Sequence, residues 1–461
     1  MFMDVNIEKL QKYLDEAVSL GSEYCSIRLQ EIWETSLLMK ERRIDEFFSG
    51  GKHGASMVVL AEGAFGLASV SPRRLGELPK RAYRSAVMSQ KLRKESVRLA
   101  DMKAVRKNVR IKAKKDMDME ERMSLVSKVE KSAREAGADS VEVTCKQTLR
   151  NQLLITSEGT MIETSLPYLR FGIQVDITKD GRGSYSERLG HVGGFEIANE
   201  YNLEEIATNA TKTAKEIAKA KGSVSGKFPV VISGWLPSVL VHESLGHMAE
   251  ADSVMAGSKL KGKIGKKIAS DQVTIIDDGT QREGYGFCPI DDEGVEGQRT
   301  VIVEKGILRS YLHSRSTAHH FSVKPTGNAR ALYAEDLPIV RMTNTFFEKG
   351  NYRFDELLEL MKNGLFLRDV RGGGQVNSQT GEFTFGVMEA FRVLKGEIKD
   401  RVKSGSITGN ILDALKKVKA VDNKYSDPKK DIGMCGKGIQ LMPVGTGNPS
   451  LFISEVLIGG E

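Results

Sequence analysis

The segment from His242 to His247 holds the side chains most able to do chemistry in this sequence, in the order His-Glu-Ser-Leu-Gly-His. Two imidazoles can bind a zinc ion, and the glutamate between them can take a proton from a water molecule. In the common zinc motif the histidines are four residues apart, which is about 40° around a helix. Here they are five residues apart, or roughly 140°, which a straight helix cannot offer to one ion.

The spacing therefore predicts a different backbone from that of the common motif. Either the helix is deformed inside the motif, or His247 lies beyond the end of the helix. Gly246 precedes His247, and a residue without a Cβ atom would allow a bend or a break at that point. Taken alone the pattern is weak, because hydrogen bonds inside a protein core can also satisfy two histidines.

A third ligand must come from elsewhere in the chain. Glu250 and Asp252 lie just downstream, but residues so close on one segment more often orient the imidazoles than bind the ion. Cys435 stands in a glycine-flanked segment where we expect a tight turn, and Lys437 would help to lower the pKa of its thiol. A thiolate with two imidazoles is a zinc-type set that leaves a position for water.

The region that must position these residues is expected to be rich in strands. Residues 228–232 form a strand pattern, and Pro237 suits the first turn of the helix that carries the histidines. From Gln272 onward, alternating segments end at glycine turns, which predicts a large antiparallel sheet or barrel-like domain. The strands expected in it include residues 273–276, 300–303, 383–387 and 451–458.

The first half of the chain contains the same unit twice. A helical pattern over residues 7–20 leads into a strand pattern from Tyr24, and a second one over residues 123–136 leads into a strand pattern from Ser140. The later segments match at an offset that drifts only from 116 to 118 residues, and each unit closes with a helical pattern. We expect an α+β fold, with an amino-terminal α/β region of two similar helix-strands-helix units before the β-rich domain.

The chain has 461 residues, which exceeds the length at which single cores usually stop growing. A glycine- and serine-rich stretch at residues 221–226 marks the main boundary. We predict three domains, over residues 1–105, 106–222 and 226–461. The first two show no cluster of metal-ligating residues, so they are expected to be scaffold or to guide the substrate.

Charge is distributed unevenly along the chain. Residues 71–115 carry sixteen Lys and Arg against three acidic residues, whereas the whole chain has a net charge of +7. Nucleic-acid binding is one reading, but the segment has a single aromatic residue, Tyr83, and no recognised motif. We expect a solvated helix face and a basic linker instead. No apolar stretch suits a membrane span or a signal peptide, so a cytoplasmic location is the expectation.

Four stretches occur in an order that resembles one known family. They are residues 242–252; residues 291–294 with 297–298; residues 325–330 with 341–345; and residues 434–437 with 443–449. Together they resemble the TldD/PmbA family of metallopeptidases, in particular its metal-containing TldD-type subunit. The resemblance covers nearly the whole chain and is strongest after residue 226.

The resemblance implies a zinc ion bound by His242, His247 and Cys435, with Glu243 as the general base. It implies hydrolysis of unfolded or unstructured peptides, with the glycine-rich segment 371–376 lining a groove for an extended chain. It also implies a heterodimer with a homologous PmbA/TldE-like subunit, a homodimer being the other possibility. A competing hypothesis is a non-catalytic peptide-binding subunit whose zinc is structural.

Overall fold

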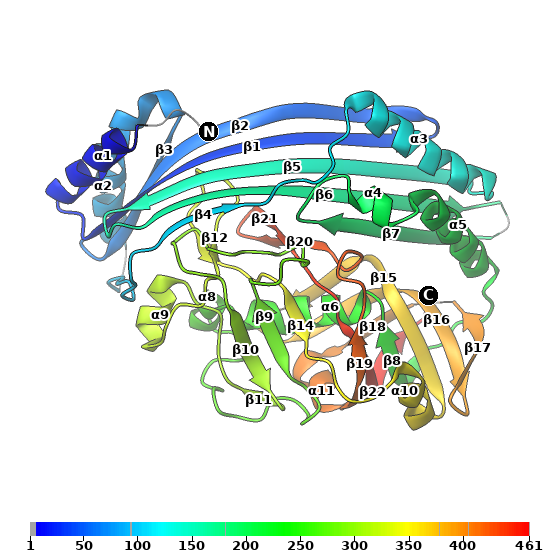
Figure 1. The fold of residues 1–461 in the computed structure, drawn as a ribbon. Helices are drawn as coiled ribbons and strands as arrows, with labels where there is room; N and C mark the ends of the chain where they lie inside the picture. The colour runs from blue at the N-terminus through cyan, green and yellow to red at the C-terminus, as the bar shows by residue number, and fades with distance from the viewer. Residues whose placement is uncertain (1–5, 93–94, 180, 378, 404, 461) are drawn as a thin grey trace.

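The computed structural model describes residues 6–92, 95–179, 181–377, 379–403 and 405–460. A long, curved amino-terminal sheet arches over a β-rich carboxy-terminal region (Figure 1). Arg93 and Lys94 of the basic segment lie outside the described residues. Among the helices that the described residues form, none combines the length and the apolar character needed to cross a bilayer.

The predicted repeat in the first half of the chain is confirmed. The first unit consists of α1 (Ile7–Ser19), β1 (Tyr24–Lys40), β2 (Arg43–Ala61), β3 (Ala64–Val70), a short 3-10 helix (Pro72–Glu77) and α2 (Leu78–Gln90). The second consists of α3 (Met119–Glu135), β5 (Ser140–Thr156), β6 (Met161–Ile177), β7 (Gly183–His191), the short α4 (Ile197–Glu200) and α5 (Leu203–Lys219). Each unit therefore folds as helix, antiparallel strands and helix.

The two units share a single sheet. Its strands follow the order β3-β2-β1-β5-β6, with β7 and β4 (Arg106–Arg110) both paired to β6. β1 and β5 join the units by an antiparallel ladder that runs from Ser26↔Thr156 to Lys40↔Glu142. The predicted division of the chain near residue 105 stays a prediction, because the sheet continues across it.

Alternate residues of β6 pack on opposite sides of this sheet, as the two-residue period of a strand requires. Leu169 and Phe171 belong to the core under α3 and α5. Tyr168, which directly precedes Leu169, packs edge to face on Tyr285 of the carboxy-terminal region, with ring centroids 5.7 Å apart. One face of the sheet thus carries helices and the other meets the β-rich region.

The expected basic linker contains a strand. β4 pairs in parallel with the first five residues of β6, while β7 pairs with a later part of the same edge. The side chains of β4 remain largely exposed, so its sequence shows none of the alternation of a half-buried strand. Backbone hydrogen bonds to the free edge of β6 explain why this charged segment is extended.

A closed five-stranded barrel forms the centre of the carboxy-terminal region. Its strands follow the order β15-β8-β22-β18-β16, and β16 pairs again with β15 to close the ring. Their bounds are β8 (Gly226–Ser233), β15 (Gly364–Asn377), β16 (Glu382–Leu394), β18 (Ser406–Asn410) and β22 (Pro449–Gly459), with β17 (Glu397–Val402) and β19 (Val418–Tyr425) at its edges. The predicted α+β fold with a β-rich, barrel-like domain is therefore confirmed.

Smaller elements surround the barrel. A four-stranded sheet contains β9 (Ile275–Asp278), β10 (Arg299–Glu304), β11 (Ile307–Leu308) and β14 (Thr345–Phe347). Two hairpins pair β12 (Ala329–Arg330) with β13 (Ile339–Val340) and β20 (Gly433–Lys437) with β21 (Gln440–Val444). The helices are α6 (Leu236–Val239), α7 (His247–Ala249), α8 (Ala251–Met255), α9 (Arg315–Phe321), α10 (Phe354–Met361) and α11 (Ile411–Lys416).

Candidate metal centre

The histidine motif lies on a helix that changes type inside the motif. α6 continues into a π-helical segment, Leu240–Gly246, which is followed by α7. A π-helix closes its hydrogen bonds over five residues, and the N–H of His247 bonds to the carbonyl oxygen of His242. The wider turn brings residues five apart to one side of the helix. The deformed helix is thereby confirmed, and a position of His247 beyond the helix end is wrong.

Gly246 serves packing rather than bending. Its backbone angles are helical, with φ −55° and ψ −55°, so the expected bend at this residue is wrong. A Cβ atom at Gly246 would lie 1.9 Å from Sδ of Met342, which no side chain can accept without a shift of the neighbour. The flanking Leu245 and Met248 are fully buried in the largest core cluster, so the π-helix is held from several sides.

The structure brings His242, His247 and Cys435 together. One donor atom from each of the three lies within 4.8 Å of the other two, and Nε2 of His247 is 3.4 Å from Sγ of Cys435. Cys435 stands in β20, not in the expected tight turn, because residues 433–437 pair with β21 and the chain reverses at Gly438 and Ile439. The hairpin thus carries the thiol to the helix.

A buried arginine holds this hairpin in place. The guanidinium of Arg341 donates hydrogen bonds to the carbonyl oxygens of Cys435 and Gln440, one on each strand of the hairpin. Arg341 is fully buried. Its role depends on carbonyl groups far along the chain, so no sequence pattern marks it beyond its place in one of the family-like stretches.

Glu250 and Lys437 form the support behind His247. Oε2 of the fully buried Glu250 lies 3.0 Å from Nδ1 of His247, which confirms the expected orienting role. Asp252 has a different contact: its carboxylate accepts a hydrogen bond from Lys437 at 2.7 Å. Lys437 also donates to Glu250 at 2.9 Å. Lys437 thus pairs with two carboxylates, and the two histidines, not Lys437, are the main groups that lower the pKa of Cys435.

The electrostatics of the cluster fit a cation at its centre. Burial alone would raise the pKa of the Cys435 thiol, but the charge and hydrogen bond of His242, with His247, lower it to about 4. Burial alone would lower the pKa of His247, but Glu250 and the thiolate raise it well above its usual value. The surrounding anions thus favour positive charge between the imidazoles, and a thiolate with imidazoles is a zinc-type donor set.

Glu243 lies where this cluster meets a cavity of about 350 Å³. Its Oε2 is 4.0 Å from Nε2 of His247, and its side chain is 32% exposed. His242 lines the same cavity. The other walls come from distant parts of the chain, with Arg170 and Arg188 from the amino-terminal sheet and Gly372 from β15. Sequence reasoning missed both arginines, since neither stands near a recognisable motif.

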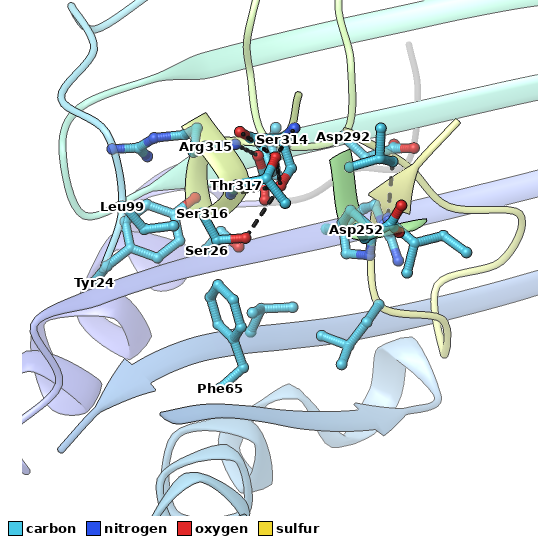
Figure 2. Close-up of a pocket in the computed structure, with 18 of the residues that line it drawn as sticks. Tyr24, Ser26, Phe65, Leu99, Asp252, Asp292, Ser314, Arg315, Ser316 and Thr317 are labelled. Atoms are coloured by element: carbon cyan, nitrogen blue, oxygen red, sulfur yellow. Dashed lines mark hydrogen bonds and ion pairs between the residues drawn. The ribbon is translucent and has the colours of Figure 1, made fainter. Parts of the chain in front are cut away.

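A second cavity of about 260 Å³ lies between the amino-terminal sheet and the region of α9 (Figure 2). Tyr24 and Ser26 of β1 lie on one side, and Ser314 and Thr317 lie on the other. Asp252 also lines this cavity. Asp252 accepts a hydrogen bond from Lys437, which also donates to Glu250 behind His247. This second cavity therefore lies next to the residues that support His247.

The chain belongs to the TldD/PmbA family of metallopeptidases. Residues 112–221 match the central domain and residues 225–460 the C-terminal domain of what is described as the PmbA/TldA metallopeptidase. A metalloprotease of Methanothermobacter thermautotrophicus is 38% identical over 95% of this chain and 96% of its own length. A metalloprotease of Methanocaldococcus jannaschii is 35% identical over 96% of this chain and 97% of its own length. A zinc metalloprotease TldD homolog of Saccharolobus solfataricus is 28% identical over 66% of each chain.

Solved structures share the fold over almost the full length. A Thermotoga maritima protein named as a modulator of DNA gyrase has a TM-score of 0.80 at 24% identity and covers 98% of this chain and 100% of its own. TldE from Thermococcus kodakarensis has a TM-score of 0.74 at 17% identity, with the same coverage. At these identities the likeness shows the arrangement of elements and not the chemistry.

Proposed function

We propose that this protein is a zinc-dependent peptidase that hydrolyses unfolded or unstructured peptides. The observation that carries the proposal is the group of two imidazoles and one thiol within 4.8 Å, with Glu243 beside it on the wall of a cavity. Membership of a metallopeptidase family supports peptide hydrolysis, and the zinc metalloprotease of Saccharolobus solfataricus supports zinc as the metal.

His242, His247 and Cys435 would hold the ion. Bound there, zinc would supply Lewis acidity, which acidifies water and polarises a peptide carbonyl group. In the part of the chain that the structure describes, the donor group has these three members. Three protein ligands are typical of catalytic zinc and four of structural zinc. The donor count therefore favours a catalytic site over the competing hypothesis of a structural zinc in a binding subunit.

Glu243 would act as the general base. Its carboxylate lies on the cavity side of the donor group, 4.0 Å from His247, where it can accept the proton of the attacking water. The same carboxyl group can then deliver the proton to the amine that leaves. Its partial exposure keeps this carboxylate within reach of solvent, whereas Glu250 is sealed behind His247.

β15 offers a backbone edge beside this cavity. Its ladder with β8 ends at Arg368↔Ser233, and its register with β16 shifts between Arg371 and Gly374. Gly372 and Gly374 line the cavity. A peptide laid along such an edge binds as an added strand through its main chain, which requires an extended, unfolded segment.

We further propose that the chain pairs with a homologous TldE-like subunit, with a homodimer as the other possibility. The support is its resemblance to the TldD-type member and the fold that it shares with TldE. Activity should therefore be measured with and without a co-expressed homologous subunit.

The test is the variant Glu243→Gln, made in the full-length, zinc-loaded protein. We expect unchanged zinc content and a fall in peptide turnover of about 100-fold or more, because the base is lost while the ligands stay. Glu304→Gln is the matched control: Glu304 is exposed on β10, where its carboxylate pairs with Arg309, so turnover should not change. Full activity of Glu243→Gln with zinc bound would contradict the mechanism.

A further inference from the structure

Two arginines of the amino-terminal sheet reach the cavity that contains His242 and Glu243. Arg170 belongs to β6 and Arg188 to β7, the strands of the sheet edge that arches over the carboxy-terminal region (Figure 1). The sheet that looked like scaffold in the sequence therefore supplies charged side chains to the site of the proposed reaction.

The strand register explains how the two guanidinium groups come together. Arg170 lies opposite Gly190, and Arg188 lies opposite Gly172. The two arginines are thus diagonal neighbours on one face of the hairpin, a distance that long side chains can span. They share that face with Tyr168, which packs on the carboxy-terminal region. Each arginine also has a glycine opposite it on the neighbouring strand, and Ile432 and Tyr285 pack directly over Gly190.

Neither arginine is neutralised by a bonded carboxylate. Within the described ranges, no hydrogen bond or ion pair joins either guanidinium to another side chain. Arg188 instead lies over the ring of Trp235, with its Cζ atom 3.7 Å from the ring centroid. Burial and then the charge of Arg170 lower the pKa of Arg188, which indicates that the two positive charges repel each other.

Three carboxylates, of Asp431, Asp369 and Glu187, act on Arg188 through their charge and raise its pKa without forming an ion pair with it. Asp431 lines the same cavity, and its Oδ2 accepts hydrogen bonds from Ser238 and Ser426. By contrast, Arg368 in the adjoining cavity is paired with the buried Glu389. Buried charges are normally paired. Two half-buried arginines on one cavity wall with no bonded carboxylate therefore suit an anionic ligand.

We propose that Arg170 and Arg188 bind a carboxylate group of the peptide substrate and so favour peptides that carry one close to the scissile bond. The proposal rests on the peptidase function proposed above. Guanidinium groups bind carboxylates through two parallel, charge-assisted hydrogen bonds. The carboxylate comes either from the carboxyl terminus of the peptide or from an Asp or Glu side chain, and both sources have the same recognition chemistry.

Binding to the zinc-loaded Glu243→Gln protein tests this proposal, since that protein leaves the peptide intact. Fluorescence anisotropy would compare three labelled peptides of one sequence: one with a free carboxyl terminus, one amidated, and one amidated with an internal Gln replaced by Glu. We expect at least one carboxylate peptide to bind about tenfold or more tightly than the neutral one. The peptide that gains affinity identifies the source of the carboxylate.

Arg170→Gln with Arg188→Gln should abolish this preference and change the affinity of the neutral peptide less than twofold. The double variant Arg170→Lys with Arg188→Lys keeps both positive charges but loses the paired N–H donors of the guanidinium groups. It should therefore retain only part of the preference. Arg182→Gln is the matched control, because Arg182 is exposed in the turn of the same hairpin. It should leave the preference intact.

Two outcomes would overturn the proposal. One is that the Glu243→Gln protein with both arginines intact binds the carboxylate and neutral peptides with equal affinity. The other is a carboxylate preference that survives in the double Gln variant, which would place the anion on the metal ion or on another cation. Both differ from a failure of the proposed function, in which the wild-type protein would hydrolyse none of the three peptides.

Discussion

Glu250 is the residue that fixes the orientation of His247. One of its carboxylate oxygens lies 3.0 Å from Nδ1 of His247 and 2.9 Å from Nζ of Lys437, and the other accepts the N–H of Met342 at 3.3 Å. A partner on Nδ1 sets the tautomer of the ring and leaves Nε2 free to face Cys435. The buried carboxylate therefore determines whether this imidazole can act as a ligand.

Glu250→Gln should weaken zinc binding by about 10- to 100-fold, as is typical when a group that orients a ligand is altered. Competition with a chromogenic chelator measures the affinity. Asp252→Asn is the matched control, because Asp252 contacts the same lysine but neither histidine, and it should leave the affinity unchanged. Equal zinc affinity of the Glu250→Gln and wild-type proteins would show that the contact does not position the ring.

The four side chains of the proposed reaction could be predicted from the sequence because their types and local context are distinctive. Their supports could not be predicted. Lys437 is two residues from Cys435, yet its partners are Glu250 and Asp252, and only the folded chain brings these segments together. Arg170 and Arg188 could not be predicted for the same reason, since their neighbours in the cavity lie far away in the sequence.

At the scale of elements, the π-helix is the feature on which the site depends. Such segments are rare and occur mostly at functional sites, and here the local widening aligns histidines that a regular helix would separate. Tight packing holds it, since Leu240, Val241 and Leu245 are fully buried. Met342 occupies the space that a side chain at Gly246 would need.

Gly246→Ala should lower the free energy of unfolding by about 1–3 kcal/mol, because the added methyl group overlaps Met342. Urea titration of the zinc-free protein measures the change. Adding Met342→Ala should relieve the overlap, so the double variant should lose less stability than the two single losses together. Strictly additive losses would mean that the contact with Met342 is not the reason for glycine.

The five-residue spacing predicted a deformed helix, but it could not select the kind of deformation. That choice depends on the core packed around the segment, including Met342, which is remote in the sequence. Likewise the period of helices and strands revealed the two amino-terminal units, whereas β4 was hidden. Its side chains are largely exposed, and its main chain pairs with β6. The pattern of polar and apolar side chains therefore does not indicate a strand there.

At the scale of the molecule, the amino-terminal sheet and the carboxy-terminal region are joined by an ion pair between a buried arginine and a partly exposed glutamate. Arg315 of α9 is 1% exposed and donates to both carboxylate oxygens of Glu158, at 2.7 and 2.8 Å. Glu158 lies in the turn between β5 and β6. The same guanidinium also bonds to the carbonyl oxygen of Ala100, so one side chain secures the arch over the site.

Arg315→Gln should lower the free energy of unfolding by about 1.5–3 kcal/mol, because it removes charge-assisted hydrogen bonds made by a buried guanidinium. Arg353→Gln is the control, since its pair with Asp355 is exposed on both sides. That variant should lose less than about 1 kcal/mol. Similar losses from both variants, measured by urea titration, would show that Arg315 does not hold the two parts together.

Zinc K-edge X-ray absorption of the purified full-length protein tests the central claim most directly. We predict about one zinc ion per chain, with two imidazole nitrogens at roughly 2.0–2.1 Å, one sulfur at about 2.3 Å and one further light atom from water. Cys435→Ser should remove the sulfur contribution alone. A spectrum without sulfur, or one with four protein ligands, would contradict a catalytic site formed by His242, His247 and Cys435.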